Sequence, residues 1–258
     1  MQFTDVLAAL RSSHDRLAAT VAPLSDEQAG QQSYADEWTI AQVASHLGSG
    51  AEIFQLIVDA GLKQSAAPGA DEFRPVWDLW NGKTAPEQVH DAVRSDAAFL
   101  DRVAALAPAE RDGWQLELFG MHQTLPTLLQ MRLCEHAVHT WDIAVALDAS
   151  ATVAPYAVDP ILGLLPGLAA RAGKGAAQPL SVHITTSDPH REYLLELSPD
   201  QAQLAEASGP AGDPATLRLP AEALIRLVYG RLDPAHTPSS LVADGVDVAD
   251  LRRAFPGF

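Results

Sequence analysis

The chain has 258 residues, enough for one large domain or two modest ones, and 47% of them are hydrophobic, which excludes a globally disordered protein. Its formal net charge of −16 repels phosphate groups, so the composition argues against non-specific binding to nucleic acid or to an anionic membrane surface. Because there is a single cysteine, Cys134, no signal peptide and no run of about 18 apolar residues, we expect a cytoplasmic protein without disulfides or membrane spans.

The first part of the chain shows apolar residues at helical spacing. Four long helices are predicted, over residues 3–24, 39–61, 86–106 and 124–148. Thr4 and Thr39 are the expected N-caps of the first two helices, and Pro23 and Gly61 their expected ends, whereas Pro86 suits the first turn of the third. Four helices joined in this way predict a four-helix bundle.

The segment between the second and third helices, residues 61–85, is rich in Gly, Pro and Ala and contains Trp77 and Trp80. We expect a long loop here. Long loops inside compact domains are often functional, so this one is a candidate cover for a site.

The composition changes near residue 150, where residues 148–160 are expected to form a linker. After it the sequence predicts a helix, two strands joined by a turn, a third strand and two further helices, over residues 158–172, 180–187, 192–198, 216–220, 221–232 and 247–255. The fold class is therefore predicted as α+β, with a helical bundle over residues 1–150 and a smaller α/β domain over residues 151–258.

The fourth helix carries the stretch "CEHAVHTWD", residues 134–142. Glu135 and His139 are four residues apart and therefore share one face of the helix. His46, in an apolar part of the second helix, is the best-placed third ligand. Two histidines and one carboxylate would hold a tetrahedral zinc with an open fourth position, which is typical of catalytic sites. The same spacing also suits an ordinary polar patch.

Other interpretations of these residues stay open from spacing alone. His46 could be a core histidine bonded to a backbone carbonyl, and Asp142 could be either a residue that orients a ligand or a solvated helix residue. Cys134 is expected to be a small core residue rather than a nucleophile, because it points about 100° away from Glu135. The remaining histidines considered, His14, His90 and His122, are expected at the surface or in loops.

Three stretches, "EWTIAQVASHLGSGAE", "RLCEHAVHTWDIAVAL" and "LPAEALIRLVYGR", together resemble the mycothiol-dependent maleylpyruvate isomerase family over nearly the whole chain. The resemblance implies a DinB-like metal-binding bundle followed by a domain similar to sterol carrier protein. It places the metal ligands, zinc or another divalent ion, on His46, Glu135 and His139. It also makes Trp38 and Arg231 candidate cofactor-binding residues, with Arg231 facing a site between the two domains.

The same resemblance implies mycothiol as the thiol cosubstrate. With its one cysteine directed away from the metal ligands, the chain needs an external low-molecular-weight thiol, which would attack a small electrophile in an isomerase or a transferase reaction. Arg231 and Asp142 are the candidate catalytic residues. Two alternatives are a metal-dependent hydrolase that uses zinc-bound hydroxide, and a binding or structural protein that has lost its chemistry. We expect neither nucleic acid nor a membrane as partner, and a monomer or a homodimer.

Overall fold

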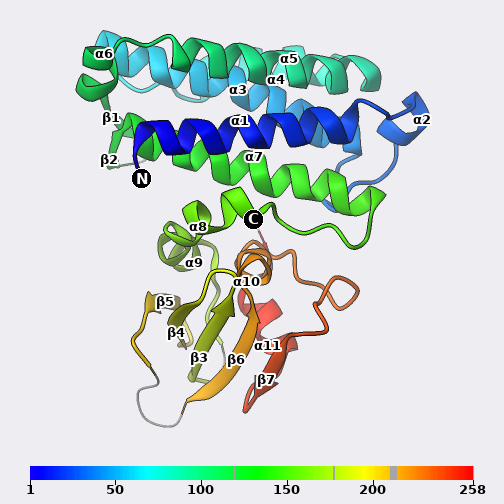
Figure 1. Cartoon of the computed structure of the whole chain (residues 1–258), viewed down its shortest axis with the longest axis vertical. Helices are drawn as coiled ribbons and strands as arrows, with labels where there is room; N and C mark the ends of the chain where they lie inside the picture. Colours follow the sequence, from blue (N-terminus) through cyan, green and yellow to red (C-terminus); the bar gives the residue numbers. More distant parts are fainter. Residues whose placement is uncertain (119, 177, 210–213, 258) are drawn as a thin grey trace. The chain divides into compact units, whose positions relative to one another are not determined.

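The computed structural model describes residues 1–118, 120–176, 178–209 and 214–257, and it divides into two compact units, Met1–Ala151 and Thr152–Phe258. The first unit is helical, with one short hairpin, and the second combines a sheet with short helices (Figure 1). The predicted α+β class is therefore confirmed. In the parts of the chain that the structure describes, no helix has the length and apolar character needed to cross a membrane.

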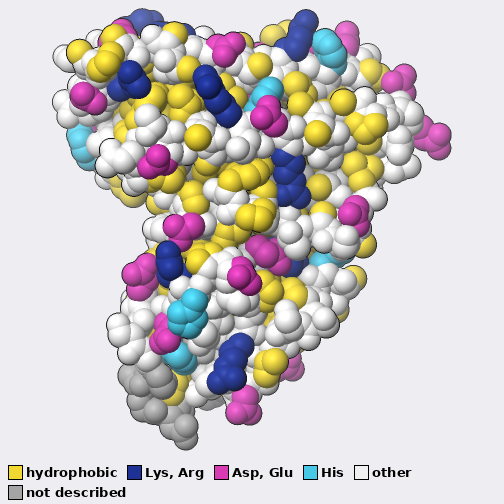
Figure 2. Space-filling model, in the orientation of Figure 1, with side chains coloured by type: hydrophobic (Ala, Val, Ile, Leu, Met, Phe, Trp, Pro, Cys, Tyr) yellow, Lys and Arg dark blue, Asp and Glu magenta, His cyan; other side chains and the backbone are white. Residues whose placement is uncertain are grey.

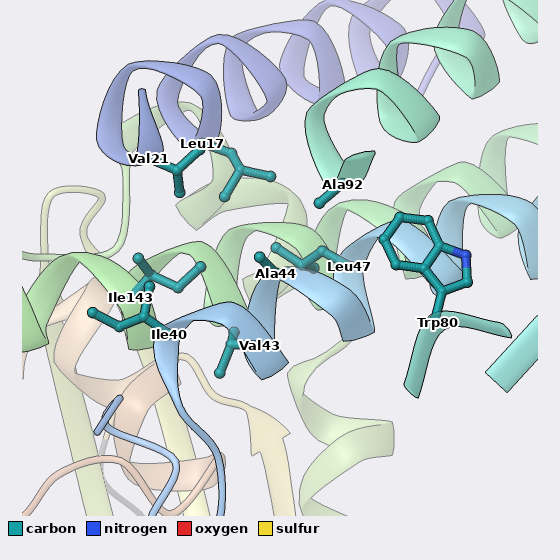
Figure 3. Packing of buried hydrophobic residues seen from close by; sticks show 9 residues of the cluster. All are labelled: Leu17, Val21, Ile40, Val43, Ala44, Leu47, Trp80, Ala92 and Ile143. Atoms are coloured by element: carbon teal, nitrogen blue, oxygen red, sulfur yellow. The ribbon is translucent and has the colours of Figure 1, made fainter. Parts of the chain in front are cut away.

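Four long helices form the bundle of the first unit. They are α1 (Phe3–Val21), α3 (Ile40–Lys63), α5 (Ala85–Ala104) and α7 (Leu125–Leu147). Each packs against two of the others, because α1 and α3 both contact α5 and α7 (Figure 1). Figure 3 shows part of the core between them, which consists of Leu17, Val21, Ile40, Val43, Ala44, Leu47, Trp80, Ala92 and Ile143.

Helix α3, which carries His46, begins and ends for identifiable reasons. The hydroxyl of Thr39 accepts a hydrogen bond from the backbone of Gln42, and the Gln42 side chain accepts one from the backbone of Thr39, so the predicted N-cap is confirmed. The predicted end at Gly61 is wrong, since the helix continues to Lys63. Gly61 lies inside the helix, and a glycine is needed there because an added Cβ would meet the Trp114 indole at 2.3 Å.

Two other expectations for the bundle are wrong. Thr4 lies inside α1, whose N-cap is Gln2, which makes no side-chain capping bond. The expected long loop contains α4 (Ala70–Asn81), which begins where the Glu72 carboxylate accepts a hydrogen bond from the Gly69 backbone. Sequence reasoning missed this helix because Gly and Pro at its borders resemble loop residues. It also missed α2 (Asp26–Ala29), α6 (Pro108–Gly113), β1 (Gln115–Leu118) and β2 (Met121–Thr124).

The second unit is built on a five-stranded sheet in the order β5-β4-β3-β6-β7, in which only β3 and β6 run parallel. Its strands are β3 (Leu180–Ser187), β4 (Arg191–Leu197), β5 (Ala202–Glu206), β6 (Ala215–Pro220) and β7 (Val242–Asp244). The three predicted strands and the turn are confirmed, whereas β5 and β7 were not predicted. On the viewed face of both units, apolar side chains are mixed with charged ones (Figure 2).

The helices of the second unit differ from the expectation at two points. The expected linker already contains the start of α8 (Pro155–Leu162), and the single helix expected over residues 158–172 is divided into α8 and α9 (Leu165–Ala172). The helix α11 (Val248–Ala254) lies where it was predicted, but α10 (Ala221–Val228) ends four residues before the predicted end at residue 232, so Arg231 follows the helix instead of belonging to it. Gly230, with a φ of 71°, turns the chain there. Helix α10 packs against α8, α9, β3 and β6, and so covers the middle of the sheet.

Candidate metal centre

The bundle brings His46, Glu135 and His139 together, as the sequence predicted. His46 lies in the second turn of α3, and Glu135 and His139 lie one turn apart on α7, which packs directly against α3. The Oε2 atom of Glu135 is 3.5 Å from Nε2 of His46 and 3.6 Å from Nε2 of His139. One donor atom from each of the three residues lies within 4.8 Å of the others, and these residues form the outer cluster.

The separations in the outer cluster fit a divalent metal. Two ligands that each lie about 2.1 Å from a tetrahedral zinc are themselves about 3.4 Å apart. The two measured separations, 3.5 and 3.6 Å, match that value. A direct hydrogen bond between an imidazole and a carboxylate would be shorter, about 2.8 Å. The donors therefore surround a point between them, and two imidazoles with one carboxylate are the donor set of many catalytic zinc sites.

Asp142 orients one of these donors. Its Oδ2 lies 2.8 Å from Nδ1 of His139, and the Asp142 side chain is fully buried. Because the carboxylate accepts the Nδ1 proton, the lone pair of His139 is on Nε2, the atom that faces Glu135. This carboxylate–histidine pair is the usual support of a metal ligand, and the alternative of Asp142 as a solvated residue is wrong.

Burial and charge shift the pKa values of His46 and Glu135 toward the protonation states that a metal needs. Burial lowers the pKa of His46 below its ordinary value, although the nearby carboxylate of Glu135 acts in the opposite direction. Burial alone would raise the pKa of the Glu135 carboxyl, but the nearby imidazoles of His139 and His46 outweigh it and hold the pKa well below its usual range. Neutral imidazoles and an ionised carboxylate are the metal-binding forms of these side chains.

One side of the outer cluster is open and one is walled by an aromatic ring. The side chains of His46 and Glu135 are 36% and 45% exposed, so a small molecule can reach the donors. The ring of Trp38 lies 5.2 Å from the His46 ring and 6.2 Å from the His139 ring, measured between centroids. Trp38 therefore offers an apolar surface beside the outer cluster, and its cofactor-binding role stays a prediction.

Several other candidates lie away from this cluster. Cys134 is buried, which agrees with the expectation of a core residue. Arg231 belongs to the second unit, where Nη1 of its guanidinium donates to the carbonyl of Tyr229 at 2.9 Å. Its catalytic and cofactor-binding roles stay predictions. His90 and His122 are exposed, as expected, but His14 is not a simple surface residue, because it is half-buried and pairs with Asp96.

The bundle contains a second group of polar side chains that sequence reasoning missed. This inner cluster consists of Ser13, His14, Asp96, Arg132 and His136. Burial alone would raise the pKa of the Asp96 carboxyl, but contacts with His136, His14 and Arg132 hold it well below its usual range. The sequence did contain a signal, since Asp96 occupies the buried face of α5 together with Ala92 and Phe99. A carboxylate in that position needs a buried partner.

Fold and site together define the class of this protein: a helical bundle that carries a candidate divalent-metal centre, joined to a smaller α/β unit. Residues 10–144 match the family model described as the mycothiol maleylpyruvate isomerase N-terminal domain, and residues 155–253 match the MDMPI C-terminal domain. The chain belongs to the mycothiol-dependent maleylpyruvate isomerase family.

Solved structures agree with this assignment at the level of the fold. A crystal structure of the mycothiol-dependent maleylpyruvate isomerase is similar with a TM-score of 0.69 and 12% identity, over 97% of this chain and 96% of that one. A histidine-to-alanine mutant of the mycothiol-dependent maleylpyruvate isomerase gives a TM-score of 0.65 and 12% identity, over 90% of each chain. The comparison with curated proteins finds no match.

Proposed function

We propose that this protein is a metal-dependent enzyme that uses mycothiol to isomerise a small cis-unsaturated acid of the maleylpyruvate type. The observation that carries the proposal is the open outer cluster, whose donors are spaced for a metal in a chain of this family. A divalent metal bound there would lower the pKa of a coordinated thiol below its ordinary value of about 8.5. Zinc suits this donor set best.

The thiol has to come from outside the chain. Cys134 is the sole cysteine, and it is buried on a part of α7 that points about 100° away from Glu135. In the isomerisation, the thiol sulfur bonds to one carbon of the cis double bond and the electron pair moves to the conjugated carbonyl. The remaining single bond rotates, and the carbon–sulfur bond then breaks to return the thiol and the trans double bond. No net oxidation occurs, so no further reactant is needed.

The chain's own residues have distinct parts in this proposal. His46, Glu135 and His139 hold the metal, Asp142 fixes the His139 tautomer, and Trp38 provides an apolar wall for the thiol or the substrate. A substrate with carboxylates also needs a cation, because a chain with a net charge of −16 repels anions in general. We assign this task to Arg231, whose planar guanidinium suits a carboxylate.

The decisive experiment compares thiol-dependent with thiol-independent turnover. Protein loaded with zinc would be assayed with maleylpyruvate in the presence of mycothiol, in the presence of glutathione and without a thiol. We expect turnover with mycothiol, little with glutathione and none without a thiol. Cys134→Ser should keep this activity. A protein that binds no metal, or that hydrolyses simple esters equally well without a thiol, would contradict the proposal, and the latter result would favour a hydrolase.

Arg231→Ala tests the substrate cation separately. We expect a higher KM for maleylpyruvate with an unchanged metal content, since Arg231 is not among the metal donors. Arg253→Ala is a suitable control, because Arg253 also belongs to the second unit and is exposed, paired with Asp250 on the same helix. Equal KM values for the two variants would remove Arg231 from the proposed mechanism and leave the metal and the thiol in place.

A further inference from the structure

The inner cluster connects all four long helices of the bundle. Arg132, on α7, donates from Nη2 to Oδ1 of Asp96 on α5 at 2.9 Å and to the carbonyl of Leu47 on α3 at 2.8 Å. Oδ2 of Asp96 lies 3.0 Å from Nδ1 of His14 on α1 and 3.2 Å from Nε2 of His136 on α7. Every helix that forms the bundle thus contributes a partner to the same carboxylate or guanidinium.

Burial makes this arrangement costly to disturb. The side chains of Asp96 and Arg132 are each 1% exposed, and that of His136 is 0% exposed, with its Nδ1 2.7 Å from the hydroxyl of Ser13. Buried ion pairs add little net stability compared with apolar residues, but loss of one partner leaves an uncompensated charge in the interior. Their best-attested use is to fix the register of packed elements, because only one register satisfies all the partners.

The contacts of the inner cluster adjoin the outer cluster along both helices. Leu47, whose carbonyl accepts from Arg132, directly follows His46 on α3, and His136 directly follows Glu135 on α7. A slide of α7 along α3 would therefore break the bond between Arg132 and Leu47 and would also separate His46 from Glu135. The inner contacts and the outer cluster therefore both require the same position of α7 relative to α3.

A glycine on α3 makes room for the guanidinium. Gly50 lies one turn after His46, and a Cβ added there would be 2.8 Å from Nη1 of Arg132. Any side chain at this position would push the guanidinium away from Leu47 and Asp96, because the Arg132 side chain is almost fully enclosed. The face of Phe54, with its ring 5.7 Å from the guanidinium carbon, closes the site one turn further along.

We propose that Arg132 is a positioning residue, which holds α7 in register with α3 through Asp96 and Leu47 and so sets the separation between His46 and the two donors on α7. The inference rests on the proposed function, since it assumes that the outer cluster binds a metal. It adds a role for Arg132 and for its two partners Asp96 and Leu47, none of which is among the candidate metal donors.

The test measures metal binding and metal geometry at matched stability. Arg132→Met keeps an unbranched apolar stem but removes the guanidinium, and with it the charge and the donors. Leu128→Ala, one turn earlier on the same helix and fully buried, loses core packing but removes none of the charged or hydrogen-bonding groups of the inner cluster. Both variants would be loaded with Co²⁺, whose visible absorption reports the coordination geometry, and their affinities would be measured by competition with a chelator.

We expect Arg132→Met to bind Co²⁺ at least tenfold more weakly than wild type, because the loss of an indirect support of a metal site lowers the affinity by about 10–100-fold. Its absorption spectrum should also be altered. Leu128→Ala should keep the wild-type affinity and spectrum despite its lower thermal stability. Arg132→Lys, which retains a positive charge and one donor group, should restore part of the affinity. Equal affinities and spectra in wild type and Arg132→Met would overturn the inference.

Gly50→Ala provides a second variant in case Arg132→Met does not fold. Its Cβ displaces the guanidinium but leaves the charge of Arg132 in place, and alanine favours the helix more than glycine by about 1 kcal/mol, which offsets part of the cost. We expect weaker Co²⁺ binding and an altered spectrum in this variant too, and an unchanged affinity would contradict the inference. If wild type itself bound no Co²⁺, the proposed function would fail. If wild type and its variants all bound Co²⁺ equally well, only the inference about Arg132 would fail.

Discussion

Two groups of polar side chains adjoin each other on α7, where His136 directly follows Glu135, and they differ in the distances between their members. In the inner cluster the polar atoms lie 2.7 to 3.2 Å apart and the central side chains are almost fully enclosed. In the outer cluster the nearest atoms are 3.5 and 3.6 Å apart, and two of the three side chains are more than a third exposed.

The difference indicates what each cluster is for. The inner cluster is almost fully enclosed and its charged atoms lie at contact distance, which favours a role in the structure of the bundle, although Nε of Arg132 and Nε2 of His136 have no hydrogen-bond partner among the described residues. Side chains of similar chemistry that stop short of hydrogen-bond distance leave a shared position for a cation. The comparison predicts that changes in the inner cluster act first on folding, and changes in the outer cluster act first on metal binding.

The largest expected effect is on folding. Asp96→Asn removes the charge that compensates Arg132 while keeping the shape of the side chain, so we expect a loss of about 3–5 kcal/mol in the free energy of unfolding. Urea denaturation in the presence of a chelator would measure this in the metal-free protein. Asp101→Asn, on the exposed side of the same helix, should change the free energy by less than about 0.5 kcal/mol. If both substitutions changed the free energy of unfolding by a similar, small amount, the inner cluster would not have the structural role that distinguishes it from the outer cluster.

For the outer cluster we expect a large loss of metal affinity and only a small loss of stability. His139→Ala removes a proposed ligand, and we expect the zinc affinity to fall more than about 100-fold, beyond the losses typical of indirect supports. The metal-free protein should be destabilised much less than in Asp96→Asn, because the donors of the outer cluster barely contact one another. Zinc content after dialysis and chelator competition would measure the affinity, with the exposed His90→Ala as the control. Unchanged zinc content in both His139→Ala and His46→Ala would rule out this metal site.

A smaller effect is expected for the residue that supports the outer cluster without joining it. Asp142→Ala removes the acceptor of the His139 Nδ1 proton, so the imidazole loses its fixed tautomer and orientation. We expect a zinc affinity about 10–100-fold weaker than wild type, between the values for His90→Ala and His139→Ala. Asp148→Ala, at the exposed C-cap of the same helix, should have no effect on zinc. An affinity as low as that of His139→Ala would instead show that Asp142 is itself a ligand.

The sequence predicted the outer cluster better than the inner one for a physical reason. Glu135 and His139 lie one turn apart on one helix, so their proximity follows from helix geometry alone. The inner cluster depends on side chains from separate helices, such as Asp96 and Arg132, which are 36 positions apart. Tertiary packing decides the register in which the helices meet and therefore which side chains of separate helices come into contact. No local sequence pattern contains that information.

The same division holds for the fold. Long amphipathic helices and alternating strands were predicted from their periodicity, because one face of each is buried. Helix α4 was missed because its interior contains Pro75 and its borders contain Gly and Pro, so local propensity opposes a helix. Packing of its Trp80 against the core, with Nε1 donating to Glu52 at 3.0 Å, stabilises it regardless. Tertiary contacts override propensity in such short segments.

The smallest expected effect concerns the edge of the inner cluster, where His14 meets solvent. The hydrogen bond with Asp96 raises the pKa of His14 above its ordinary value of 6.5, and the nearby charges of Asp96, Asp15 and Asp101 act in the same direction, whereas partial burial opposes them. The folded protein therefore binds this proton more tightly than the unfolded chain does. The resulting stability is fully present below pH 6.5, the unfolded value, and is lost as the pH rises through the folded pKa.

His14→Gln removes this titration while keeping a donor near Asp96. We expect wild type to exceed the variant in unfolding free energy by about 1 kcal/mol below pH 6.5, the scale of a partly exposed pair, and by progressively less at higher pH. Urea denaturation across that pH range would measure the difference, and His90→Gln, at an exposed position, should show none. A difference that grew with rising pH would mean that His14 is held neutral in the folded protein. His14 would then contribute no charge to the compensation of Asp96, which would depend on the contacts with Arg132 and His136.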